Sequence, residues 1–236
     1  MEHLAPILLG TPGWGIVLTI LSYNVGLLIQ KRCGGLSVAN PVFISIILIG
    51  GFLRLTGISY QSYYLSAQFI PFLLGPATVA FAVPLVRNQK HLRGRTSPII
   101  LSLVAGSLVS AVSGIGLVAL CGGSRTVAFS MAPKAVTTPI AMSVAQTCGG
   151  IPSLSAVFAI AGGILVAMSA KWLFGRSKIT DVRAFGFAAG TAGSGIGAAH
   201  ALAFRELAGT FAALAVGFNG LFTPLIVPAI ASFWPR

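Results

Sequence analysis

Acidic side chains are almost missing from this chain of 236 residues. Glu2, Asp181 and Glu206 stand against fifteen lysines and arginines, and charged residues of both signs make up only 8% of the sequence. Soluble domains carry about 25% charged residues, so the composition excludes an ordinary soluble protein. Paired aspartates, a zinc motif and a serine dyad are also missing, and we therefore expect neither enzymatic activity nor a metal or other cofactor.

Cysteine is scarce as well. Cys33, Cys121 and Cys148 are scattered along the chain, odd in number and without the spacing of metal ligands. We interpret them as small packing residues.

Long apolar runs are what the chain has in abundance. Hydrophobic residues make up 56% of it, and a membrane-spanning helix needs ~20 of them in succession. The sequence therefore predicts an all-α polytopic membrane protein with about six to eight transmembrane or re-entrant elements. We expect residues 1–236 to form a single integral membrane domain.

The basic residues lie between the apolar runs, where loop charge sets membrane orientation. Lys31 and Arg32 follow the first predicted span, Trp14–Gln30, and place the amino terminus outside. The basic stretches Arg87–Arg95 and Lys171–Arg183 mark further cytoplasmic loops. Orientation accounts for this charge, so we do not expect a nucleic-acid partner; for Arg87–Arg95, phosphate or lipid binding is the alternative.

Further helices are predicted over residues 41–53, 97–120 and 153–174. In the apolar segment Tyr60–Val86, the Gly75-Pro76 pair predicts a broken helix. The last span, Leu207–Trp234, is expected to be interrupted at Asn219-Gly220 and at Pro224.

The stretch Met131–Pro152, MAPKAVTTPIAMSVAQTCGGIP, is apolar on both sides yet carries helix-breaking residues. Pro133 and Pro139 each remove a backbone donor, so a continuous helix is excluded and two half-helices should meet between Lys134 and Pro139. Irregular backbone within a membrane is tolerated only inside protein or beside a watery cavity. We therefore interpret this break as the functional site.

Several side chains are candidates for binding a small anionic substrate there. Lys134 would supply charge and Thr137 and Thr138 hydrogen bonds, unless Lys134 extends to the membrane surface as an ordinary flanking lysine. Asn219 either binds substrate or forms hydrogen bonds across helices. The remaining candidates are the prolines that shape the breaks and three further polar or flexible positions: Pro76, Pro133, Pro139, Thr78, Ser194 and Gly195.

A glycine-rich stretch, Phe185–His200, is predicted to be too flexible for an isolated helix, since each glycine costs ~1 kcal/mol relative to alanine. His200 and Glu206, which come near its end, are candidates for proton coupling. For Glu206 a structural ion pair with Arg205 or Arg183 is the alternative, and Asp181 is expected to be solvated in a loop.

A weak internal repeat relates residues 75–118 to residues 193–227 by the order of their elements. Repeats with paired interrupted segments are typical of secondary transporters. We therefore expect an internal repeat, with inverted halves, and an elevator-like transporter architecture, although loop charge alone leaves the orientation of the halves open.

Four stretches resemble the successive signatures of the LrgB/CidB membrane protein family: LLGPATVAFAVPL from Leu73, MAPKAVTTPIA from Met131, GGIPSLSAVF from Gly149 and GTAGSGIGAAHAL from Gly190. The family usually has serine at Ala135, histidine at Ser194 and arginine at His200, and the last two differences change hydrogen bonding and charge. The resemblance implies a multi-pass protein of the bacterial inner (plasma) membrane with a separate LrgA-type membrane partner, and we also expect a homo-oligomer.

Two functions follow from this resemblance. Relatives that translocate glycolate, glycerate or pyruvate imply a secondary transporter of small monocarboxylates, lactate included, which we expect to be coupled to protons. The holin/antiholin-like description of the family implies instead a pore, or a regulator of murein hydrolase export and autolysis. A lysine inside a helix break of a chain almost devoid of acids favours the transporter.

Overall fold

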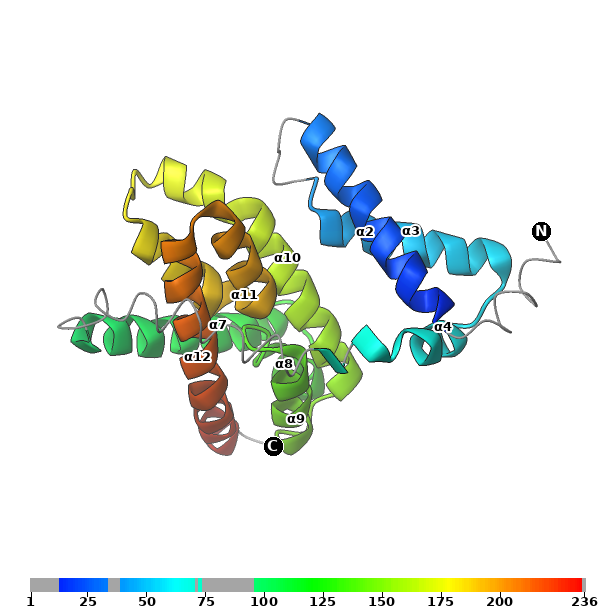
Figure 1. The fold of residues 1–236 in the computed structure, drawn as a ribbon. Coiled ribbons are helices and arrows are strands. Elements are labelled where there is room, and N and C mark those ends of the chain that lie inside the picture. Colours follow the sequence, from blue (N-terminus) through cyan, green and yellow to red (C-terminus); the bar gives the residue numbers. More distant parts are fainter. Residues whose placement is uncertain (1–12, 34–38, 71, 74–95, 235–236) are drawn as a thin grey trace. The chain divides into compact units, whose positions relative to one another are not determined.

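The computed structural model describes residues 13–33, 39–70, 72–73 and 96–234, and in this part of the chain all regular secondary structure is helical (Figure 1). Four of these helices are long and apolar enough to cross a membrane: Trp14–Arg32, Ser97–Leu120, Pro152–Arg176 and Glu206–Phe233. The chain is therefore an all-α polytopic membrane protein, as its composition predicted. The Gly75-Pro76 break and the basic stretch Arg87–Arg95 lie outside the described residues.

Backbone contacts divide the chain into two compact units, Met1–Ala80 and Phe81–Arg236. The first contains α2 (Trp14–Arg32), α3 (Pro41–Thr56) and α4 (Tyr60–Ala67). The second contains α7 (Thr96–Leu120), α8 (Arg125–Met131), α9 (Thr138–Thr147), α10 (Pro152–Arg176), α11 (Val182–Phe204) and α12 (Glu206–Phe233). The single membrane domain stays a prediction.

Within the first unit, α2 packs against α3 and α4. The side chain of Asn40 accepts hydrogen bonds from the first amides of α3, which starts that helix at the predicted residue. The Thr19 and Tyr63 hydroxyls, 2.7 Å apart, join α2 to α4. With 16 residues α3 remains short for a span.

In the second unit, α8 and α9 form a first helical hairpin. The break between them, Ala132–Thr137, falls where the prolines predicted it. After α9 the chain comes back to α8. Gly150 packs on the backbone of Phe129 and Ser130, and the Ile151 amide donates a hydrogen bond to Ser130 Oγ over 2.7 Å. Two arms and a tip therefore replace the continuous helix that the sequence excluded.

The helix α11 consists of two arms joined at Ser194, which form a second hairpin. Ser194 has φ 50° and ψ −140°, which interrupts the helix there, and Gly197 packs on the carbonyl group of Ala189. Residues eight positions apart in a straight helix are about 12 Å apart, so the chain reverses at Ser194. The prediction that this glycine-rich stretch is too flexible for an isolated helix stays a prediction, because here its helical arms are packed against other helices.

The glycines of α11 are what allow its close packing. Gly186 and Gly190 lie against the backbone of Ala208 and Ala212 in α12, where a Cβ would collide. Contact between backbones at small residues stabilises helix pairs in membranes and compensates the poor helix propensity of glycine.

The last helix, α12, is continuous from Glu206 to Phe233 and contains Pro224 and Pro228. The expected interruption at Asn219-Gly220 and Pro224 was therefore wrong. The buried face of α12 carries Asn219, Thr223 and Val227, and packing by neighbouring helices lets a membrane helix tolerate prolines.

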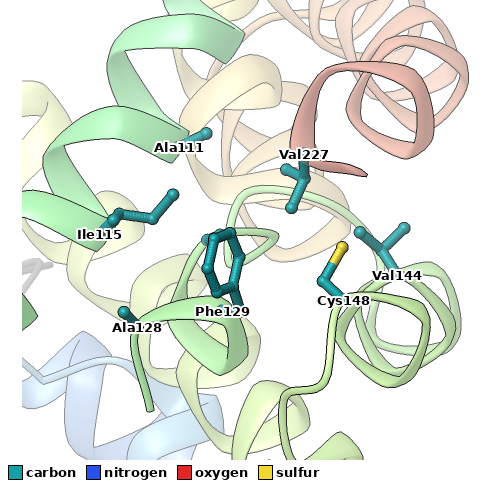
Figure 2. Packing of buried hydrophobic residues seen from close by; sticks show 8 residues of the cluster. Ala111, Ile115, Ala128, Phe129, Val144, Cys148 and Val227 are labelled. Carbon is teal, nitrogen blue, oxygen red and sulfur yellow. The ribbon is translucent and has the colours of Figure 1, made fainter. Parts of the chain in front are cut away.

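Phe129 fills the centre of the core that joins the first hairpin to α7 and α12 (Figure 2). Ala111 and Ile115 of α7, Val144 and Cys148 of the second arm, and Val227 surround its ring. The three cysteines are free. Cys148 is buried in this core, as expected of a small packing residue, whereas Cys33 and Cys121 are exposed, so the packing interpretation was wrong for these two.

Candidate functional site

The tips of the two hairpins meet on the middle of α10. A Cβ on Gly162 would lie 3.8 Å from the carbonyl oxygen of Lys134, in the first tip. A Cβ on the adjacent Gly163 would lie 3.0 Å from the carbonyl oxygen of Gly193, in the second tip. Two glycines in sequence therefore let both breaks approach the same helix, an arrangement that the sequence analysis did not foresee.

Lys134 extends from the first tip to the middle of α7. Its Nζ donates to the carbonyl oxygen of Ser110 over 2.5 Å and lies 3.3 Å from the Ser110 hydroxyl. Gly114, one turn further along α7, leaves room for the ammonium, since a Cβ there would lie 3.0 Å from Nζ. A lysine that extended to the membrane surface would not lie beside the middle of a long apolar helix.

No carboxylate pairs with Lys134 among the described residues. Asp181 caps α11 and pairs with Arg183 over 2.9 Å. Its side chain is 46% exposed, which agrees with the expected solvation, and the hydrogen bonds from Arg183 lower its pKa. Glu206 is exposed in the first turn of α12. The half-buried ammonium therefore carries a charge that no described acid balances.

The threonines of the first tip are the second element of the site. Thr137 precedes α9 without capping it through its side chain, and Thr138 is the first residue of that helix. Both are half-buried, and their hydroxyls make no hydrogen bond within the described part of the chain. Pro139 stands in the first turn of α9, and Pro133 is buried in the tip.

Asn219 is the polar centre of the second unit. Its side chain is fully buried and donates to the carbonyl oxygens of Ala135 and Thr191 over 2.9 and 3.0 Å. Its oxygen accepts from the hydroxyls of Ser107 and Thr223. Since carbonyls only accept, the amide nitrogen must face Ala135 and Thr191. All four hydrogen-bonding positions are taken, so the geometry matches the alternative of hydrogen bonds across helices.

Ser194 forms the tip of the second hairpin. Its side chain is 5% exposed, and its buried Oγ has no hydrogen-bond partner in the described part of the chain. A positive φ at a residue other than glycine costs of order 1–3 kcal/mol and concentrates at functional sites. Gly195 beside it is half-buried, with no atom within 4 Å of where its Cβ would be. The tip is thus strained and polar.

The proton-coupling candidates lie away from the tips, at the base of the second hairpin. His200 is half-buried beside Phe185, with 6.4 Å between the ring centroids. Glu206 makes no ion pair with Arg205 or Arg183 within the described residues. Pro76 and Thr78 lie outside the part of the chain that the structure describes.

Four partners of the site were not singled out as functional from the sequence: Ser107, Ser110, Thr191 and the Gly162-Gly163 pair. Ser110 and Gly114 belong to a small-residue pattern that also fits ordinary helix packing. Ser110 and Thr191 contribute backbone carbonyls, and because every residue has one, their part in the site cannot be predicted from residue type. Within the described residues, no three His, Cys, Asp or Glu side chains gather as they would to hold a metal ion.

The described part of the chain therefore defines the class as all-helical membrane proteins with two broken helices, the first of which carries a lysine that no described acid balances. Residues 19–233 match the LrgB-like family. The chain belongs to this family.

Similar curated proteins come from Bacillus mycoides, Bacillus cereus and Bacillus anthracis, and each is named Antiholin-like protein LrgB. The chain is 30% identical to each over 223 residues, which is 94% of this chain and 97% of the relative. The protein is therefore a multi-pass protein of a bacterial membrane. No solved structure matches it.

Proposed function

We propose that the protein is a secondary carrier of small monocarboxylates such as glycolate, glycerate, lactate or pyruvate, and that Lys134 binds the carboxylate. One observation carries the proposal: the Lys134 ammonium at the first hairpin tip, which contacts Ser110 and no described acid. A half-buried charge without a counter-ion is costly. An anionic substrate would neutralise it.

The neighbours of Lys134 suit the same ligand. The Thr137 and Thr138 hydroxyls are free to donate, and the amino-terminal end of α9, where negative charge is favoured, starts beside them. Together they could replace the hydration shell of one carboxylate. Asn219 fixes the first tip through the Ala135 carbonyl, the residue next to Lys134, so it positions the site without binding substrate.

Transport in this proposal proceeds by movement of the hairpins relative to α10. The tips meet at Gly162-Gly163, and breaks in facing elements are the places where transporters bind substrate and change access. An elevator-like movement, proton coupling through His200 and Glu206, a homo-oligomer and an LrgA-type partner belong to the same proposal.

The test is uptake of labelled glycolate and pyruvate into proteoliposomes, with and without an LrgA-type protein. Loss of a charge-assisted hydrogen bond costs about 1.5–3 kcal/mol, so Lys134→Ala should reduce uptake at low substrate by about 10- to 100-fold. Lys134→Arg, which keeps the charge, should retain more activity. Lys31→Ala, an exposed lysine at the end of α2, is the matched control and should transport normally.

The second candidate function is a holin/antiholin-like pore or regulator. The name of the curated relatives favours it, and backs it better than it backs the carrier. A pore needs no saturable site. Leak of unrelated solutes that does not saturate and is unchanged in Lys134→Ala would replace the carrier by the pore.

A further inference from the structure

A cavity of about 290 Å³ lies at the base of the second hairpin. Its walls come from the last turns of α10, the turn that follows, and the two ends of α11. It is separate from the hairpin tips, and neither Lys134 nor Ser194 lines it.

Two cations line this cavity, and no described acid pairs with either of them. Lys171 and Arg205 are exposed, and neither makes an ion pair with a described residue. The one carboxylate in the wall belongs to Asp181, which three hydrogen bonds from the Arg183 guanidinium already occupy over 2.9–3.3 Å. The cavity is therefore complementary to an anion.

The rest of the wall is aromatic. Phe185 packs against Phe174 on one side and Phe204 on the other, with 5.2 Å between ring centroids in both pairs. A larger and mostly apolar cavity of about 470 Å³, between α7 and α11, shares Phe174, Ile179 and Asp181 with it. An anion with a long apolar part would fill both cavities, whereas a free inorganic anion would leave the aromatic wall bare.

The cavity also lies at the depth of a lipid headgroup. Lys171 precedes the end of α10 at Arg176 by five residues, or about 7.5 Å. The basic residues around this end mark the cytoplasmic side of the membrane, the leaflet that is rich in anionic lipid.

We propose that this cavity binds an anionic phospholipid. The phosphate lies between Lys171 and Arg205, and an acyl chain runs along Phe174, Phe185 and Phe204 into the adjoining cavity. The site ties the base of the second hairpin to the cytoplasmic leaflet, and the proposal holds whether the protein is a carrier or a pore.

The experiment measures thermal unfolding of the full chain in neutral detergent, with native mass spectrometry to count bound lipid. Phosphatidylglycerol should raise the unfolding midpoint and stay bound, whereas phosphatidylcholine and inorganic phosphate should do neither. Lys171→Gln combined with Arg205→Gln should lose most of the rise, and Lys171→Arg with Arg205→Lys should keep it. Arg176→Gln with Lys178→Gln removes two charges nearby that do not line the cavity, and should also keep it.

Three results would overturn the proposal: an equal rise with inorganic phosphate, an equal rise with phosphatidylcholine, or an undiminished rise in the Lys171→Gln, Arg205→Gln protein. If the Lys171→Gln, Arg205→Gln protein does not fold, a second experiment tests the site in a protein that keeps Lys171 and Arg205. In a variant whose three natural cysteines are replaced by serine, Thr180→Cys puts a single thiol in the wall of the cavity. Phosphatidylglycerol should slow its reaction with a maleimide, and an unchanged rate would equally exclude the site.

Discussion

At the scale of single residues, Asn219 is an intramembrane polar side chain whose hydrogen-bonding positions are all filled by the protein itself. Its amide joins α7, both hairpins and α12 through four hydrogen bonds. Sequence analysis left binding and structural roles open for Asn219, because the residue type suits both. The difference lies in whether its hydrogen-bonding positions are filled, which only the fold decides.

Asn219→Ala should lower the free energy of unfolding, since each buried group left without a partner costs about 1–3 kcal/mol. Asn219→Asp should be worse, because a carboxylate would face the two carbonyl oxygens of Ala135 and Thr191. Thermal unfolding in detergent measures both. Asn24→Ala, which removes an exposed asparagine bonded within α2, should have little effect; equal losses for Asn24 and Asn219 would contradict the role described.

Ser194 combines a positive φ with a buried hydroxyl that has no described partner, and two variants can separate the effects of these features. Ser194→Gly should raise the free energy of unfolding by about 1 kcal/mol, because glycine adopts a positive φ without strain. Ser194→Ala keeps the strain and removes only a hydroxyl that has no partner, so its stability should stay close to that of the native chain.

Uptake measured on the same two proteins distinguishes the roles of Ser194. If the hydroxyl contacts substrate, both variants should lose uptake equally, whatever their stability. Loss confined to Ser194→Gly would mean that the strained tip, and not the hydroxyl, matters.

At the scale of elements, the hairpins depend on glycines whose purpose is close approach. Gly162 and Gly163 offer a matched pair. A Cβ on Gly163 would be 3.0 Å both from Gly193 O and from the Ile196 Cβ, whereas on Gly162 it would have an ordinary contact of 3.8 Å with Lys134 O.

Gly163→Ala should therefore push the second tip away from α10 and lower both the unfolding midpoint and uptake. Gly162→Ala should be tolerated, and by helix propensity alone should gain ~1 kcal/mol. Unfolding and uptake of the two variants are measured side by side. Should Gly163→Ala prove as stable and active as Gly162→Ala, the tip would not rest on α10 as described.

At the scale of the whole molecule, the three natural cysteines report orientation. Cys33 is exposed and follows Lys31 and Arg32 at the end of α2. Cys121 is exposed and follows the last residue of α7, a helix that begins just after the basic stretch Arg87–Arg95. Cys148 is buried. In single-cysteine variants of intact cells, an impermeant maleimide should label Cys121 at once and Cys33 only after permeabilisation. Cys148 should react only on unfolding. Labelling of Cys33 from outside would reverse the orientation.

Composition and proline placement by themselves determined much of this molecule. A chain that is 56% hydrophobic with three acids has to be membrane-embedded, because little of it tolerates water. Pro133 and Pro139 forbid a continuous helix whatever surrounds them, so the first break was predictable, whereas the reversal of the chain into a hairpin was not. Lys134 was conspicuous for the same local reason, since a charge within an apolar stretch is rare.

The tertiary structure alone decided the second hairpin, the continuity of α12 and the hydrogen-bond partners of Asn219. Glycines in α11 weaken a helix in isolation, yet they let its backbone reach Ala208 and Ala212, and that packing reverses the local preference. Prolines in α12 remove donors but end no helix, since neighbours cover its buried face. Each outcome depends on contacts between segments far apart in sequence, which no local pattern encodes.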